Sequence, residues 1–183
     1  MNAPAASEPM PPPEAAAAEL AVYAHETEDS DSRHYYTQRW ARIANGAGAL
    51  GFNWPACLFG SNWCLWRKQY LLAIGIYAGE AACAVALGIG YAFGRGQALE
   101  PGDPVLGLLP YLALPIVRIP LGVVANRVYL ERARSVIRAA HARATRSERV
   151  EQIRSNGGTS PLALGAGILV NLVGIAWSRL HAI

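Results

Sequence analysis

The feature that most constrains the fold is an apolar stretch of 23 residues, 71–93, in which Glu80 is the only charged residue. An α-helix rises about 1.5 Å per residue, so this stretch would be about 34 Å long. The hydrocarbon core of a bilayer is about 30 Å thick, and the core of a water-soluble domain seldom needs a helix of this length and composition. The stretch therefore predicts a transmembrane helix.

Two further stretches, 104–126 and 161–178, repeat this pattern, and Arg118 is their only charged residue. The whole chain is 52% hydrophobic and 16% charged, whereas about a quarter of the residues of soluble domains are charged. We therefore predict an all-α fold, a small polytopic helical membrane protein with three transmembrane helices. Prolines within 104–126 predict that the second of these helices is kinked or interrupted.

The segment before the first span, 33–66, is rich in aromatic residues and predicts helices in the headgroup layer. Asn53 is the predicted N-cap of a helix over 54–66, which at about 20 Å is too short to cross a bilayer. Either residues 47–66 cross the membrane or they form an interfacial or re-entrant helix. The tendency of basic residues to stay on the cytoplasmic side favours the second alternative. The predicted interfacial anchors are Trp54, Trp63, Trp66, Arg67, Lys68 and Tyr70.

The charges outside the spans are unevenly distributed. Residues 1–34 hold seven acids and a single base, Arg33. Because residues 1–32 also have few aromatic or branched apolar side chains, we predict a disordered, acidic cytoplasmic tail over this range. The alternative is that this tail docks on a partner or on a basic segment of the chain. A short C-terminal tail, 179–183, follows the last span.

The basic segment is 127–154, which holds eight arginines and three glutamates. Its apolar residues recur at helical spacing, so we predict a basic amphipathic helix on the cytoplasmic side. Such a helix either binds anionic lipid or forms a solvated cover over the membrane domain. The pattern lacks the interleaved aromatic residues typical of nucleic-acid binding. The predicted lipid or partner surface is formed by Arg132, Arg134, Arg138, Arg143 and Arg146.

Charged residues inside a span are costly and usually face a partner or a cavity. Counted from the cytoplasmic end of each helix, Glu80 lies at a depth of about 13 Å, Arg118 at about 12 Å and Asn171 at about 15 Å. We therefore predict an intramembrane polar cluster of these three residues. The cluster is either a structural clamp that fixes helix register or a site for transport or proton coupling. A third alternative is that Arg118 extends to the membrane surface by itself.

The sequence contains no evident enzymatic centre. Its four histidines are dispersed, and it lacks a zinc-binding HExxH pair, a GxSxG nucleophile elbow and a phosphate-binding loop. The spacings of Cys57, Cys64 and Cys83 do not suit a closed metal site, so we interpret them as small packing residues. We expect neither a cofactor nor a metal, and we name no catalytic residue.

The aromatic and basic residues from Tyr35 onward resemble those of a known family. The opening of the small bacterial membrane proteins catalogued as domain of unknown function 2628 is similar to Tyr35-Tyr36, Trp40, Phe52 to Ala56, Phe59-Gly60, Trp63, Trp66-Arg67-Lys68 and Tyr70. Later parts of the family resemble Gly122, Asn126, Tyr129 and residues 157–160, so that the resemblance covers about residues 35–178. It implies an integral membrane protein of bacterial type and supplies no activity.

From these observations we expect a multi-pass protein of the bacterial inner membrane, with its N-terminus in the cytoplasm. The leading hypothesis is a non-enzymatic accessory or scaffold protein that binds a partner or anionic lipid at the cytoplasmic face. The expected protein contacts are another membrane protein or a second copy of this chain. The alternative is an oligomeric small-solute or ion transporter that uses Glu80, Arg118 and Asn171.

Overall fold

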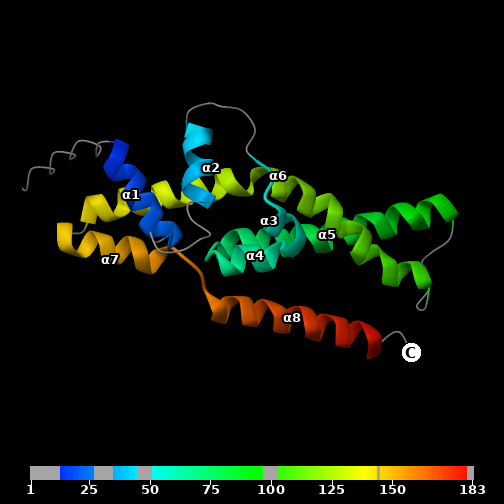
Figure 1. Cartoon of the computed structure of the whole chain (residues 1–183). Helices are drawn as coiled ribbons and strands as arrows, with labels where there is room; N and C mark the ends of the chain where they lie inside the picture. Colours follow the sequence, from blue (N-terminus) through cyan, green and yellow to red (C-terminus); the bar gives the residue numbers. More distant parts are fainter. Residues whose placement is uncertain (1–12, 27–34, 45–50, 97–102, 144, 181–183) are drawn as a thin grey trace, which may run out of the picture. The chain divides into compact units, whose positions relative to one another are not determined.

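The computed structural model describes residues 13–26, 35–44, 51–96, 103–143 and 145–180. Regular structure within these ranges is entirely α-helical (Figure 1), which confirms the predicted all-α fold. The helices, in chain order, are α1 (Pro13–Ala24), α2 (Tyr35–Ala44), α3 (Trp54–Phe59), α4 (Ser61–Trp66), α5 (Tyr70–Arg95), α6 (Pro104–Arg143), α7 (Arg146–Asn156) and α8 (Pro161–Leu180).

Three helical stretches of the described chain are long and apolar enough to cross a membrane, in agreement with the three predicted spans. The first is α5, of 26 residues, and the second is Gly107–Ala142 within α6. The third stretch, Glu148–Ala176, takes in most of α7 and α8, and its apolar part is α8 because α7 is polar. Most side chains of these stretches are exposed in the isolated chain, as expected where lipid covers them.

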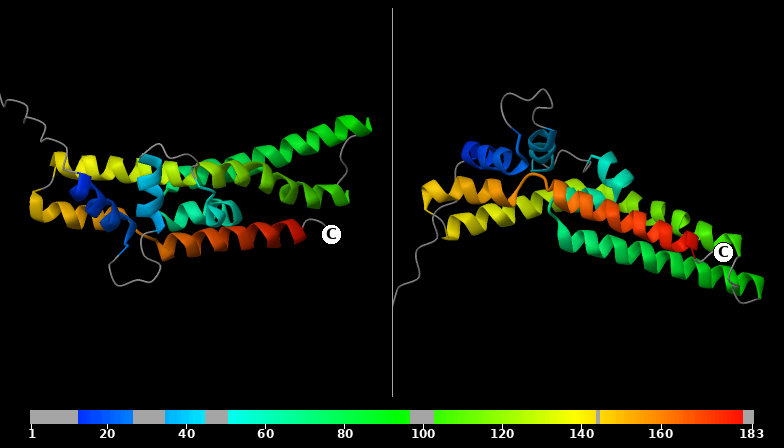
Figure 2. Two further views of the ribbon diagram at one scale, coloured as in Figure 1. Left: turned by 45° about the horizontal axis from the view of Figure 1, so that its top comes forward. Right: turned by 90° about the horizontal axis from the view of Figure 1, so that it is seen from below.

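The chain forms two compact units, which we describe separately. The first unit contains residues 1–51 and 126–158, and the second contains residues 52–125 and 159–183. In the second unit the short helix α4 packs against α5 and α8, and both views of Figure 2 show α4 alongside α8.

α6 is a continuous helix of 40 residues, although it contains Pro110, Pro115 and Pro120. Of the two predicted alternatives, a kinked or an interrupted helix, the interruption is therefore wrong. Each proline removes one backbone donor, and their five-residue spacing leaves hydrogen-bonding residues between them. The predicted helix over 127–154 is also wrong as a single element, because its first part is the end of α6 and its second part is α7.

The break between α6 and α7 has a capping signal in the sequence. The backbone N–H of Thr145 donates a hydrogen bond to Oε2 of Glu148 over 3.0 Å, and the Thr145 hydroxyl donates to the same oxygen over 2.7 Å. This is the capping-box pattern, a Ser or Thr followed three residues later by Glu or Gln, and it marks the start of a helix. α7 therefore begins as a separate helix and ends at Asn156, with Gly157 as its C-cap.

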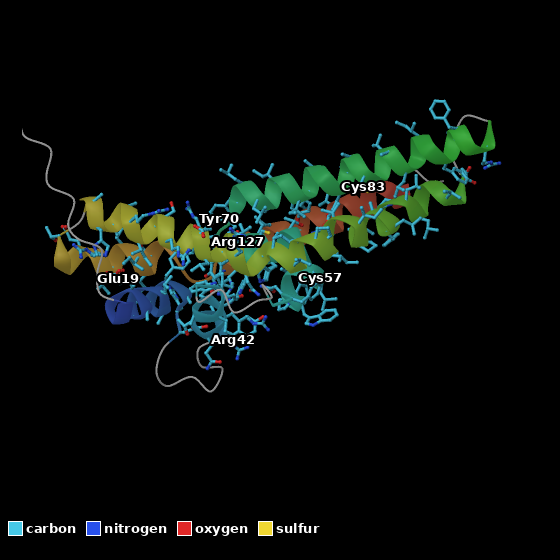
Figure 3. The ribbon with its side chains drawn as sticks, turned by 90° about the horizontal axis from the view of Figure 1, so that it is seen from above. Glu19, Arg42, Cys57, Tyr70, Cys83 and Arg127 are labelled. Atoms are coloured by element: carbon cyan, nitrogen blue, oxygen red, sulfur yellow. The ribbon has the colours of Figure 1, made fainter. Side chains whose placement is uncertain are left out.

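In the first unit, residues 13–24 form α1, so the prediction of a disordered tail is wrong for them; residues 1–12 and 27–32 lie outside the described ranges. α1 packs against α2 and α7. Glu19, labelled on α1 in Figure 3, lies 2.9 Å from Nε2 of His141 on α6 through its Oε1. The described part of the tail, α1, therefore docks on the basic segment of its own chain, which was one of the alternatives considered for it.

Four aromatic side chains form much of the core of this unit. The ring of Tyr129 on α6 lies 5.0 to 5.5 Å, between centroids, from the rings of Tyr23, Tyr36 and Trp40. All four residues are at most 5% exposed, and aromatic pairs at these distances stabilise a fold beyond the area that they bury. An isolated helix as short as α1 is marginal in water, so this tertiary contact explains why the segment is helical.

Residues 54–66 form two short helices, α3 and α4, instead of one. Asn53 is the N-cap of α3 as predicted, because its Oδ1 accepts a hydrogen bond from the backbone N–H of Ala56 over 2.9 Å. Gly60 separates the two helices with φ at +51°, a conformation that favours glycine. Each helix has six residues, about 9 Å in length, so neither crosses a bilayer.

Candidate functional site

The second unit brings together the two charged residues of the predicted spans. Arg118 of α6 donates a hydrogen bond from Nε to Oε1 of Glu80 on α5 over 2.7 Å. The Arg118 side chain is 19% exposed and the Glu80 side chain 13% exposed. A guanidinium and a carboxylate in direct contact neutralise each other where a single charge would be costly. The pair can therefore hold α5 and α6 in one register.

Arg118 also holds the short helix α3. Its Nη1 donates a hydrogen bond over 3.0 Å to the carbonyl oxygen of Leu58, which lies in the last turn of α3, where intrahelical donors are lacking. Gly60 provides the space for this contact, because a Cβ atom at that position would lie 2.6 Å from Nε of Arg118. One guanidinium thus joins α3, α5 and α6.

Asn171 belongs to a second polar group. Its Nδ2 donates to the hydroxyl of Tyr77 over 3.1 Å and to the carbonyl of Gly167 over 2.8 Å. The Tyr77 hydroxyl lies 3.2 Å from Oδ1 of Asn62, to which it donates. A Cβ atom at Gly167 would lie 2.6 Å from the same Oδ1, so α8 approaches α4 closely here. None of the hydrogen bonds of Asn171 runs to the ion pair, and the predicted cluster of three residues is in fact two groups.

The predicted interfacial tryptophans have different surroundings. Trp54 is 64% exposed, and Tyr70, at the start of α5, is 47% exposed, as expected of side chains at a lipid surface. Trp63 is only 4% exposed, so its prediction as an interfacial anchor is wrong. The reason is that α4 packs between neighbouring helices, which cover this side chain. Trp66 is half-buried, and its carbonyl accepts a hydrogen bond from the backbone N–H of Ser160 over 2.8 Å.

The predicted basic anchors form the turn from α4 into α5. Lys68 has φ at +56°, and its N–H donates to the carbonyl of Leu65 over 3.1 Å. The next N–H, of Gln69, donates to the carbonyl of Cys64 over 2.8 Å. These two bonds are those of a Schellman motif, with lysine where glycine is usual. The side chains of Arg67 and Lys68 are half-buried at this turn, directly before the first span.

The basic face of α6 is the other predicted site. Three of the five predicted arginines have described side chains, and all three are exposed: Arg132, Arg134 and Arg138. Arg134 lies 3.1 Å from Glu131, an exposed pair that contributes little to stability. The side chains of Arg143 and Arg146 lie outside the described part of the structure. The turns of α6 that follow its apolar part therefore expose guanidinium groups that can bind an anion.

The chemistry of these groups is limited to charge and hydrogen bonding. Within the described ranges, no three His, Cys, Asp or Glu side chains lie close enough to hold a metal ion. The two polar groups of the second unit engage their side chains with one another and with backbone carbonyls. They can join helices, whereas the exposed arginines of α6 can bind anions.

Sequence reasoning missed the residues that complete the two polar groups: Leu58, Gly60, Asn62 and Tyr77. A signal for the break between α3 and α4 was present, because Gly60 is followed by Ser61 and Asn62, a composition typical of turns. A signal for Tyr77 was its position three residues before Glu80, which places both on one side of α5. No sequence signal identifies the carbonyl of Leu58 as a ligand of Arg118.

A comparison with protein families places part of the chain in a known family. A family model with the description "Protein of unknown function (DUF2628)" matches residues 23–134. The match therefore includes the aromatic residues of α1 and α2, the α3–α4 pair, α5 and most of α6, and it stops before α7 and α8. No curated protein and no solved structure matches the chain.

Proposed function

Because this chain belongs to the DUF2628 family, whose description assigns no activity, we propose a function from the geometry of its own residues. The protein is a non-enzymatic accessory or scaffold protein of the bacterial inner membrane that crosses it several times. Its N-terminus lies in the cytoplasm. There, the basic face of α6, defined as Arg132, Arg134 and Arg138, binds the headgroups of anionic lipids.

The distribution of charge supports this orientation. Arg67 and Lys68 precede α5, and the arginines after Asn126 follow the apolar part of α6, so both sets lie on the same side if each helix crosses once. At the opposite ends of these helices, Arg95 is paired with Asp103 over 2.9 Å, which neutralises its charge. An excess of basic residues on one side identifies the cytoplasmic side in most membrane proteins.

The observation that carries the proposal is the exposure of Arg132, Arg134 and Arg138 within two turns of one another on α6. A basic residue near an anionic membrane surface contributes about 1 kcal/mol to the attraction. Three of them would strengthen binding by on the order of 100-fold. The intramembrane ion pair, in turn, supports an accessory role over transport, because both of its charges are engaged in joining helices.

The experiment measures lipid-dependent thermal stability of the full chain in detergent. Addition of phosphatidylglycerol is expected to raise the Tm of the wild type more than addition of phosphatidylcholine does, because ligands that bind the folded state stabilise it. In the triple variant Arg132→Gln, Arg134→Gln and Arg138→Gln, most of this difference should disappear. Arg95→Gln, which removes a charge at the other end of α5, is the matched control and should keep it.

A triple variant that responds to phosphatidylglycerol as the wild type does would contradict the proposal. The transporter alternative makes the opposite prediction in reconstituted vesicles. If solute or ion flux is lost when Glu80→Gln and Arg118→Gln are combined, and is kept in the triple arginine variant, the protein is a transporter. An accessory protein should tolerate the combined Glu80 and Arg118 change and keep its lipid response.

A further inference from the structure

In the first unit, Arg39 on α2 makes close contacts with Tyr35 and Gly51. The guanidinium of Arg39 lies over the ring of Tyr35, with 4.5 Å between Cζ and the ring centroid. The guanidinium also lies close to Gly51, whose backbone has φ at +53°. A Cβ atom at Gly51 would collide with Nη1 of Arg39 and lie 3.3 Å from its Cζ. Arg39 is therefore restrained by contacts with an aromatic ring and with the backbone.

Arg39 is half-buried, yet among the described residues it has no ion-pair or hydrogen-bond partner. The acid closest to it along the described chain, Glu26, is used elsewhere. Its carboxylate accepts hydrogen bonds from the backbone N–H groups of Tyr36 and Thr37, over 2.6 and 3.2 Å, and from the Thr37 hydroxyl over 2.8 Å. Removing a guanidinium from water without a counter-charge is unfavourable, so the site favours an anion from outside the chain.

The position of Arg39 relative to α6 indicates which anion it meets. The carbonyl of Gly51 accepts a hydrogen bond from Nδ2 of Asn126 over 2.7 Å, and Nε1 of Trp40 donates to the Asn126 carbonyl over 3.2 Å. Asn126 lies where the apolar part of α6 ends and Arg127 begins the basic part. In the membrane orientation proposed above, on which this step rests, Asn126 lies at the depth of the lipid phosphates.

We propose that Arg39 binds the phosphate of an anionic phospholipid headgroup, and that Arg42 is its second ligand. Arg42 is three residues further along α2 and exposed, so it lies on the same side of this helix. The planar guanidinium group matches two phosphate oxygens at once, and an arginine that is already held in place loses little conformational freedom on binding. The site holds one headgroup, in contrast to the diffuse attraction of the basic face of α6.

Native mass spectrometry of the full chain tests the site by counting the phospholipids that stay bound. With phosphatidylglycerol, the wild type is expected to retain one lipid after the others are released. Arg39→Gln should weaken this binding about 10-fold, the usual effect of losing a charge-assisted hydrogen bond. Arg127→Gln is the matched control. Arg127 is exposed, directly follows Asn126 on α6 and lies well apart from Arg42 (Figure 3). This variant should keep the lipid.

A structural role of Arg39 has a different signature. If Arg39→Gln lowers the Tm equally with phosphatidylglycerol and with phosphatidylcholine, Arg39 only packs against Tyr35 and Gly51, and the proposal is wrong. If millimolar inorganic phosphate displaces the lipid, the site is one for soluble phosphate and not for a headgroup. The triple variant of the α6 face separates this proposal from the previous one, because it should keep the single retained lipid even if it loses the general response to phosphatidylglycerol.

Discussion

Arg118 on α6 and Glu80 on α5 form a hydrogen-bonded ion pair of 2.7 Å, and both side chains are mostly shielded within the second unit. Arg118 makes a further bond to the carbonyl of Leu58, so the pair is asymmetric: the arginine serves two neighbours and the glutamate one. Loss of the glutamate leaves the arginine with a carbonyl partner. Loss of the arginine leaves a carboxylate that has no counter-charge in a low-dielectric setting.

The first prediction is a charge exchange at this pair. Glu80→Arg and Arg118→Glu should each lower stability by about 3 kcal/mol, because each places two like charges together inside the unit. The double exchange should recover part of this loss but not all of it. An arginine at position 80 lies on α5 instead of α6, so the hydrogen bond from Arg118 to the Leu58 carbonyl is lost. The measurement is thermal unfolding of the detergent-solubilised protein, in which size-exclusion chromatography after heating gives the amount of folded protein.

The exposed pair of Arg134 and Glu131, with side chains 43% and 54% exposed, provides the control. Its exchange should change stability by well under 1 kcal/mol, because solvent screens exposed ion pairs. Single variants at Glu80 and Arg118 that unfold at the wild-type temperature would show that the pair does not hold α5 and α6 together.

A second prediction concerns Gly60. Gly60→Ala places a Cβ atom 2.6 Å from Nε of Arg118 and forces a non-glycine residue into a positive φ. We expect a loss of about 2 kcal/mol, from backbone strain and displacement of the arginine. Gly90→Ala is the matched control, because Gly90 lies in α5 with open space around its Cα. There alanine should be neutral or stabilising, since it favours helix more than glycine does. Equal effects at the two positions would contradict the role of Gly60.

Local sequence signals predicted the elements that depend on local chemistry. The length and composition of 71–93 was sufficient to place α5, and Asn53 was sufficient to start α3, because hydrophobic length and capping are properties of a few neighbouring residues. The contact between Glu80 and Arg118 follows from equal depth in two antiparallel spans together with opposite charge. These arguments need no knowledge of how helices are rotated against one another.

The predictions were wrong where tertiary packing determines the structure of a segment or the partners of a side chain. The predicted depth of Asn171 does not specify which side of α8 faces which neighbour, and the partners of Asn171 are Tyr77, Gly167 and Asn62. The composition of 13–24 suggested disorder, yet one buried aromatic residue, Tyr23, packs on Tyr129 and fixes α1. Contacts of this kind join residues far apart in the chain, and a single sequence does not reveal them.

A third prediction concerns the polar group around Tyr77. Tyr77→Phe and Asn171→Ala should each lower stability by about 1 kcal/mol, because each removes a hydrogen bond that joins α5 to α8. The double variant should cost less than the sum of the single variants, since both remove the same bond. A double-mutant cycle on thermal unfolding measures this coupling. If the two losses simply add, the bond between the two side chains makes no contribution to stability.

The last prediction is a pH effect at the start of α7. Hydrogen bonds from the hydroxyl and the backbone N–H of Thr145 hold the pKa of Glu148 below its ordinary value of 4.5. A carboxylate with a lowered pKa stabilises the folded state fully above that ordinary value, and its contribution is lost as the pH falls through the folded-state pKa. Thr145→Ala removes the hydroxyl donor, so the pKa of Glu148 should rise toward 4.5 in a carbon-detected NMR titration of the full chain. Ser155→Ala, which removes a hydroxyl at the other end of α7, should leave the titration of Glu148 unchanged. An unchanged pKa in Thr145→Ala would mean that the capping box does not restrain this carboxylate, and the start of α7 would then need another explanation.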